Sequence, residues 1–392
     1  MNPPAPRTLA RRTPLVLAVL TVIAIVGFIA VSRLVARLKA NQKQIAWHAY
    51  EGGLLEVQAN RPERALDDFR AALSYDHDNP RYQLSLARAL RDTGRLDESE
   101  AYLVHLWDAA PQDSTINLAL ARLAARRGSI EDAIRYYHNA IYGAWATDAD
   151  KNRRQARFEL IQFLLNQNAR PQAQAELIAL AQILPPDPDL HLTVADLLVR
   201  AQDYQNALAE YQTVLKLDHN NAAAQAGAGE AAFHLGRYRT AEKYLQEAGG
   251  RQPGNSELRT QLQTAKLILE TNPFLRRISD AERNRRIRSA FDHAGDRLKS
   301  CAQSKNIDLS ASGAYNNAVQ NSAPDLPSLW ARWQASRPQL AHLNNPDNTD
   351  LPDTLMDLIV QIEQQTAQQC GEPSGIDLAL LLSSRDRESV DQ

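Results

Sequence analysis

Residues 133–140 read AIRYYHNA, and the same spacing recurs in ALDDFRAA at 65–72 and SEAYLVHL at 99–106. Three more segments follow it: AQAELIAL at 173–180, ALAEYQTV at 207–214 and AEKYLQEA at 241–248. Each begins with a small residue and has a large apolar residue four positions later and another apolar residue three positions after that. Residues at i, i+4 and i+7 share one face of an α-helix. The pattern therefore predicts six related helices.

The first residues of these segments are separated by 34, 34, 40, 34 and 34 residues. Five positions before each segment stands a glycine or polar residue suited to a turn: Asn60, Gly94, Gly128, Asn168, Gln202 and Gly236. A helix–turn–helix unit that repeats at a fixed period is typical of a solenoid, in which each repeat buries its apolar face against its neighbours. The 40-residue step contains an insertion near 143–150, which we expect to form a loop between the third and fourth repeats.

This register resembles the tetratricopeptide repeat family, with six copies over about residues 46–255. Pairs typical of the first helix of such repeats are also present, as in Leu86-Ala87, Leu120-Ala121 and Val194-Ala195. The resemblance implies an all-α fold, a right-handed superhelix of about six helix–turn–helix repeats, and a concave groove that binds other proteins. Within the family, the chain resembles bacterial-type members that have an N-terminal membrane anchor.

Residues 13–32 contain no charged side chain and follow a short basic tail, 1–12. Twenty helical residues span about 30 Å, the thickness of the hydrocarbon core of a bilayer. We therefore predict a transmembrane anchor over 13–32 and a juxtamembrane helix over 33–45. A cleaved signal peptide is the alternative, because Ala30-Val31-Ser32 resembles a cleavage site, although signal peptides have shorter apolar regions. A buried core helix is disfavoured because the segment is apolar on every face.

The charges on both sides of this anchor are nearly balanced, with Arg7, Arg11 and Arg12 before it and Arg33, Arg37, Lys39 and Lys43 after it. Long domains are translocated largely regardless of charge, whereas a compact basic tail stays in the cytoplasm. We expect a single-pass protein of the inner membrane with its body in the periplasm or otherwise outside the cytoplasm.

The repeats are followed by a helix predicted at 256–271 that caps the array and by a helical domain predicted at 272–382. Two apolar stripes define this domain, Ile287 to Cys301 and Leu355 to Cys370, with a shorter helix carrying Trp330 and Trp333 between them. Residues 383–392 are predicted to be a frayed tail. The C-terminal region resembles no family that we recognise.

Cys301 and Cys370 are the only cysteines in the chain, and each ends one of these stripes. Antiparallel packing of the two helices would bring the thiols together, and disulfides persist outside the cytoplasm. We predict a Cys301–Cys370 disulfide; two buried thiols that act as small apolar side chains are the alternative.

No sequence pattern indicates catalysis, a cofactor or a metal. Residues 227–232, GAGEAA, match the G-x-G-x-x-A dinucleotide motif, but that motif functions only between a strand and a helix. Both glycines fall inside a predicted helix, so we expect them to serve helix packing. A net charge of −2 does not favour nucleic-acid binding. The basic cluster Arg283, Arg285, Arg286 and Arg288 has acidic neighbours and is interpreted as a solvated helix face, with a contact to nucleic acid or anionic lipid as the alternative.

Ligand contacts in tetratricopeptide repeats come mainly from the first helix of each repeat. Carried onto this chain, those positions place five arginines over the second and third repeats and an apolar and amide-lined stretch in the fourth. The predicted partner-binding residues are Arg81, Arg88, Arg91, Arg122, Arg126, Phe158 and Gln162. Guanidinium groups favour carboxylates and phosphates, although surface arginines without a ligand remain the alternative.

These features predict a non-catalytic, membrane-anchored scaffold whose groove binds an acidic or amphipathic segment of another protein. No cofactor, metal, nucleic acid or small-molecule substrate is expected. The alternatives are a regulatory or assembly subunit of an envelope polysaccharide- or lipid-synthesis enzyme, and an enzyme confined to the C-terminal domain.

Overall fold

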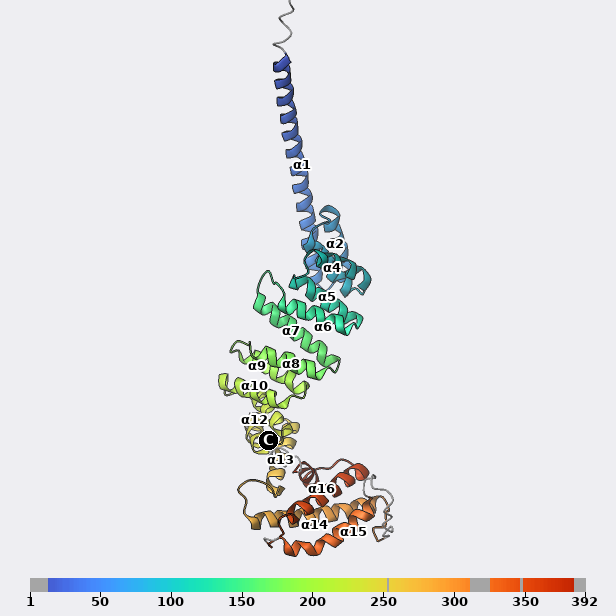
Figure 1. Cartoon of the computed structure of the whole chain (residues 1–392), viewed down its shortest axis with the longest axis vertical. Coiled ribbons are helices and arrows are strands. Elements are labelled where there is room, and N and C mark those ends of the chain that lie inside the picture. The colour runs from blue at the N-terminus through green and yellow to red at the C-terminus, as the bar shows by residue number, and fades with distance from the viewer. Residues whose placement is uncertain (1–12, 252–253, 311–324, 346–347, 384–392) are drawn as a thin grey trace, which may run out of the picture. The chain divides into compact units, whose positions relative to one another are not determined.

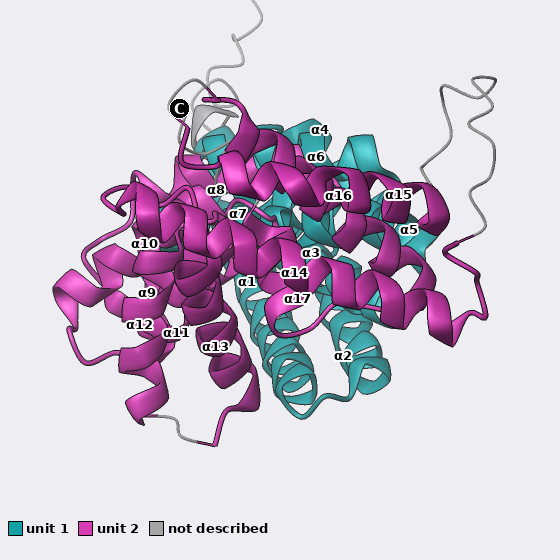
Figure 2. Ribbon diagram, turned by 90° about the horizontal axis from the view of Figure 1, so that it is seen from below, with its two compact units in different colours: residues 1–167 teal, residues 168–392 magenta. Residues whose placement is uncertain are grey.

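The computed structural model describes residues 13–251, 254–310, 325–345 and 348–383, and the chain forms two compact units, residues 1–167 and 168–392 (Figure 2). The described residues fold into α-helices and one 3-10 helix, without a strand apart from an isolated bridge between Asp113 and Ala144. The predicted all-α class is confirmed.

Each helix of the first unit packs against the next one along the chain. The helices are α1 (Thr13–Gln58), α2 (Pro62–Tyr75), α3 (Pro80–Asp92), α4 (Leu96–Ala109), α5 (Ser114–Arg127), α6 (Ile130–Tyr142) and α7 (Ala149–Asn166). The insertion forms the loop between α6 and α7, as predicted.

The second unit continues the same serial packing and then adds a different domain. Its array helices are α8 (Arg170–Ala181), α9 (Pro188–Arg200), α10 (Tyr204–Leu217), α11 (Ala222–His234), α12 (Tyr238–Arg251) and α13 (Ser256–Thr271). The remaining helices are α14 (Asp280–Ser304), α15 (Leu326–Ser336), the 3-10 helix η1 (Arg337–His342), α16 (Leu351–Cys370) and α17 (Ile376–Ser383).

The small residue that opens each repeated segment is completely buried: Ala65, Ser99, Ala133, Ala173, Ala207 and Ala241 are all 0% exposed. The larger residue four positions later is buried in every repeat as well, as for Phe69 and Leu177. A small side chain is needed there because the two helices of a repeat approach closely at that position. The 34-residue period in the sequence therefore corresponds to the repeated packing contact between the two helices of each repeat.

The turn residues identified from the sequence all have left-handed backbone geometry, with φ between 57° at Asn60 and 81° at Gly94. Glycine adopts this geometry without strain, and asparagine tolerates it better than most residues. Gln202, with φ of 61°, is the least suited of the six. The left-handed residue reverses the chain between the two helices of a repeat.

A second periodic signal in the sequence, a capping residue, marks the start of five of the array helices. The side chains of the residues before α3, α5, α9, α11 and α13 accept hydrogen bonds from backbone N–H groups of the first turn; they are Asn79, Asp113, Asp187, Asn221 and Asn255. Such caps each stabilise a helix by about 1 kcal/mol. They fix where each repeat begins.

The predicted anchor, juxtamembrane helix and first helix of the array form one unbroken helix, α1 (Figure 1). Its apolar part is long and hydrophobic enough to cross a membrane, and an N-terminal signal sequence would pass the same test. Near its end Ala46 and Tyr50 are buried against α2 and α3. Its last turns therefore belong to the repeat array.

The C-terminal domain has its core between α14, α15 and α16, where Phe291 and Trp333 stack with ring centroids 5.1 Å apart. Helix α17, which the sequence pattern did not separate from this domain, also packs against α13 at the end of the array. Ser383, assigned to a frayed tail, instead ends α17 with 2% of its surface exposed. The rest of that predicted tail, 384–392, lies outside the described residues.

Helices α14 and α16 pack side by side, and the structure joins Cys301 to Cys370 in a disulfide with Cα atoms 5.7 Å apart. Cys301 is buried, whereas Cys370 lies exposed at the end of α16. The disulfide covalently joins the C-terminal ends of α14 and α16, the two longest helices of the domain.

The GAGEAA segment lies inside α11, and the described part of the chain contains no strand that could precede it. A methyl group added at Gly227 would lie 2.2 Å from Cζ of Tyr211, and one at Gly229 would lie 2.7 Å from Leu245. Both glycines thus allow α11 to approach its neighbours, which is the packing role expected from the sequence.

Candidate functional site

Three of the predicted arginines gather on the first helices of two consecutive repeats in the first unit. Arg88 and Arg91 lie on α3, and Arg122 lies on α5 at the same repeat position as Arg88, 34 residues later. Burial, Arg122 and Arg91, in that order, lower the pKa of Arg88. The fold therefore concentrates positive charge around a partly desolvated guanidinium group.

Arg122 is neutralised by Glu159 of α7. Its Nε and Nη2 atoms donate hydrogen bonds of 2.8 and 2.7 Å to the two carboxylate oxygens, and Gln155 adds a third bond of 3.2 Å. Burial opposes ionisation of Glu159, but the bonds from Arg122 and Gln155 outweigh it and lower the pKa of Glu159. The pair is therefore ionised and fixed in orientation.

Arg91 is paired locally, because its Nε and Nη2 atoms donate to Asp92 Oδ1 at 2.9 and 2.7 Å. Its third nitrogen, Nη1, is inaccessible to solvent and bonds to nothing within the described residues. Arg91 thus keeps one unused donor beside Arg88.

Arg88 has no carboxylate partner within the described ranges, and its Nε is shielded from solvent and donates no hydrogen bond to any described residue. Around it, Ser85 donates a hydrogen bond of 3.4 Å to the Tyr50 hydroxyl. Burial and the nearby Glu159 raise the pKa of Tyr137 to about 12, so this phenol stays protonated. Three guanidinium groups therefore face two carboxylates, which leaves one positive charge without a partner.

The remaining predicted residues lie apart from Arg88, Arg91 and Arg122. Arg81 is exposed on the first turn of α3 and Arg126 on the last turn of α5, and no bond between described residues connects either one to Arg88. On α7, Phe158 is half-buried and Gln162 is exposed. We name Arg88, Arg91 and Arg122, with Asp92 and Glu159, the arginine cluster.

The second unit carries acidic residues at the repeat position of Arg88 and Arg122, which our sequence reasoning missed. Counting onward by 40 and then by 34 residues leads from Arg122 to Gln162, Asp196 and Glu230. Tyr211 donates a hydrogen bond of 2.7 Å to Asp196, and burial is the main cause that raises the pKa of Glu230. The signal was available, because the repeat register aligns these positions directly.

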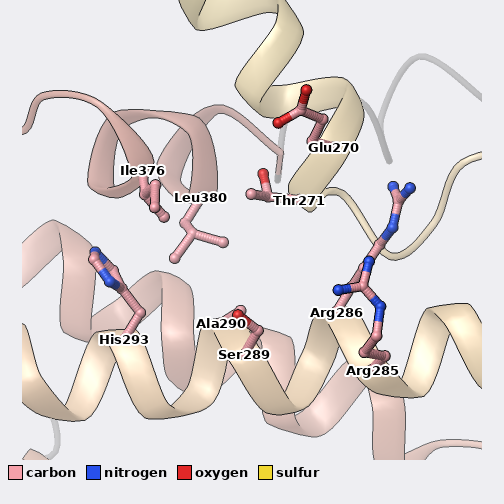
Figure 3. Close-up of a pocket in the computed structure, with 9 residues that line it drawn as sticks. All are labelled: Glu270, Thr271, Arg285, Arg286, Ser289, Ala290, His293, Ile376 and Leu380. Atoms are coloured by element: carbon pink, nitrogen blue, oxygen red, sulfur yellow. The ribbon is translucent and has the colours of Figure 1, made fainter.

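A pocket of about 370 Å³ lies among α13, α14 and α17 (Figure 3). Arg285 and Arg286 lie at one end of it, and Ile376 and Leu380 lie towards the other. Both arginines donate hydrogen bonds to Glu282, and Arg286 also donates to the backbone oxygens of Leu269 and Asn272 at the end of α13. Arg286 therefore joins α14 to the end of α13, whereas Arg285 pairs within α14.

The other two members of that basic cluster are occupied as well: Arg283 pairs with Asp280 at 3.0 Å, and Arg288 donates to the backbone oxygen of Leu340 at 3.3 Å. Across the described residues, no three His, Cys, Asp or Glu side chains are placed to hold a metal ion.

Comparison with known proteins gives one family model that matches two parts of the chain. A model of the tetratricopeptide repeat matches residues 56–123 and 198–265. A search of curated proteins gave no match. The solved structures that resemble the chain include PilF of Pseudomonas aeruginosa, with 17% identity over 56% of this chain and 97% of that one and a TM-score of 0.39.

Two further structures are similar over part of the chain. The type IV pilus biogenesis factor PilW has 17% identity over 56% of this chain and 99% of its own, with a TM-score of 0.39. The C-terminal part of a repeat-containing protein from Cytophaga hutchinsonii has 14% identity over 61% of this chain and 93% of its own, with a TM-score of 0.43.

Proposed function

We propose that this chain, which a tetratricopeptide repeat model matches over residues 56–123 and 198–265, is a non-catalytic scaffold, anchored in a membrane by α1, which binds an acidic segment of another protein. The observation that carries the proposal is Arg88, a partly buried guanidinium group without a carboxylate partner in the described structure. A carboxylate from a partner would complete the arginine cluster.

The chemistry of the arginine cluster favours a carboxylate ligand. Hydrogen bonds between ionised groups are shorter and stronger than neutral ones, and guanidinium groups bind carboxylates through two parallel bonds. Arg88 Nε and Arg91 Nη1 are buried donors without partners. Leaving a buried donor unsatisfied costs about 1–3 kcal/mol, which a bound carboxylate would remove.

The continuous helix α1 supports the anchoring part of the proposal. A helix that runs without a break from the apolar segment into the first repeat would hold the array close to the bilayer. Tethering raises the effective concentration of a binding site toward partners in the same membrane. The Cys301–Cys370 disulfide supports a body outside the cytoplasm, because disulfides are rare inside it. We therefore propose that it is a single-pass protein of the inner membrane with an extracytoplasmic body.

Replacing Arg88 by glutamine is expected to have opposite effects on binding and on stability. Loss of a charged hydrogen bond of about 1.5–3 kcal/mol should weaken binding roughly 10- to 100-fold. The free protein should become more stable, because the variant removes a guanidinium group that burial and two neighbouring arginines disfavour. The measurement pairs the melting temperature with the affinity of full-length protein in nanodiscs for a labelled peptide of alternating glutamate and leucine.

The matched control is Arg64→Gln, which removes the same charge from an exposed position on α2 of the same unit. It should change neither the affinity nor the melting temperature. Binding to the wild-type protein should also weaken as salt rises, since salt screens partly exposed ion pairs. A more stable Arg88→Gln protein that keeps its full affinity for the peptide would place the acidic segment elsewhere.

A further inference from the structure

Helix α17 connects the end of the repeat array with the C-terminal domain inside the second unit. Ala379 packs with Tyr238, Ala265 and Ile268 of the array, whereas Leu380 belongs to the core of the C-terminal domain. The helix is only eight residues long. Its position therefore depends on side-chain contacts and not on intrinsic helix stability, because helices this short are marginal alone.

A cluster of charged side chains holds the first turn of α17. Asp377 forms a 2.6 Å hydrogen bond with His293 Nε2 and also pairs with Arg297 Nη1, both from α14. Arg297 Nε donates to the hydroxyl of Thr366 on α16 at 3.1 Å. Asp377 thus links α17 to α14, and Arg297 extends this link to α16.

Glu363 of α16 lies behind this link and is completely buried, with 0% of its surface exposed. Its Oε2 is 3.2 Å from Arg297 Nε, yet neither carboxylate oxygen takes part in a hydrogen bond within the described part of the chain. On α15, the charged side chain Arg332 donates a hydrogen bond to Gln361 of α16 and not to Glu363. Glu363 therefore interacts with Arg297 of α14 and Asp377 of α17, and shares one guanidinium group with Asp377, whose other partner is His293 of α14.

We propose that α17 is a proton-controlled latch, closed while Glu363 is neutral and released when Glu363 ionises. In the neutral state Arg297 balances Asp377 alone, and the cluster has no unpaired charge from these two groups. When Glu363 loses its proton, its buried carboxylate and the half-buried carboxylate of Asp377 compete for Arg297. Releasing α17 lets water reach both, which relieves the repulsion and the cost of burying an unpaired charge.

The direction of the pH dependence follows from proton binding. Burial and then Asp377 raise the pKa of Glu363 from 4.5 to about 8, against the opposing effect of Arg297. Between these two values the closed state holds more protons than the open state, so the opening equilibrium rises about tenfold for each pH unit. Above about pH 8 Glu363 is ionised in both states, and the dependence levels off.

The test compares hydrogen exchange of the α17 amides in full-length wild type and Glu363→Gln at pH 5.5, 6.5 and 7.5. The ratio of the two rates cancels the intrinsic pH dependence of exchange. This ratio should rise about tenfold per pH unit, or nearly 100-fold over the series. It should keep rising in His293→Gln compared with His293→Gln/Glu363→Gln, which separates the carboxylate from the imidazole.

Amides of α11 in the array give the internal control and should show a ratio that does not change with pH. A constant ratio for α17, or an equal rise in α11, would overturn the latch. The experiment involves no partner, so its outcome is independent of binding at the arginine cluster.

Discussion

Removing the disulfide by the double substitution Cys301→Ala/Cys370→Ser is expected to destabilise the C-terminal domain by about 4 kcal/mol. The two cysteines are 69 residues apart, so the bond closes a long loop and removes much conformational freedom from the unfolded chain. A loss of this size should accelerate exchange of the protected amides of α14 and α16 roughly 1,000-fold. Hydrogen exchange followed by mass spectrometry measures this acceleration for each helix separately.

Wild-type protein treated with a reductant should reproduce the double variant, and the amides of α5 in the first unit should remain protected in both. A change below 1 kcal/mol would mean that the packing of α14 on α16 already restricts the chain without the bond. Alkylation in intact cells addresses the side of the membrane. Thiols that are blocked until reduction support an extracytoplasmic body, whereas two freely alkylated thiols would contradict it.

The repeat fold could be predicted because its determinants are local and periodic. Ala133 and Ala207 are buried by the partner helix of their own repeat, so the small residue and the turn before it recur together along the chain. The position of α17 could not be predicted in the same way. Its eight residues contain no repeated pattern, and its contacts with Tyr238 and Ala265 join segments more than 100 residues apart.

The candidate site was predictable by position and not by pairing. The family register selected Arg88 and Arg122 together, but it could not show that Glu159, 37 residues after Arg122, neutralises only the second. Arg81 and Arg126 are also arginines at ligand-contact positions of the family register, yet they are exposed and lie outside the arginine cluster. Glu363 shows the converse limit, since a carboxylate on an apolar helix face gives no sign in the sequence that it is completely buried.

Substituting alanine for Gly227 is expected to destabilise the second unit by about 3 kcal/mol, at the upper end for overpacking a buried site. The new methyl group would lie 2.2, 2.5 and 2.6 Å from Cζ, Cε1 and Oη of Tyr211. Tyr211 cannot withdraw easily, because its ring is buried and its hydroxyl is bonded to Asp196 at 2.7 Å. Either α11 must move away from α10 or that hydrogen bond must break. Urea unfolding followed by hydrogen exchange of α10 and α11 gives the change in free energy.

Gly249→Ala is the matched control, since an added methyl group there meets no atom within 4 Å. This exchange in α12 should stabilise the helix by about 0.5 kcal/mol, because alanine has the higher helix propensity. Adding Tyr211→Leu to Gly227→Ala should recover part of the loss, so the double variant should cost less than the sum of the single ones. Additive losses would show that Gly227 serves something other than contact with Tyr211. A glycine needed by a nucleotide-binding loop would behave in that way, and the coupling therefore separates helix packing from the dinucleotide motif that GAGEAA resembles.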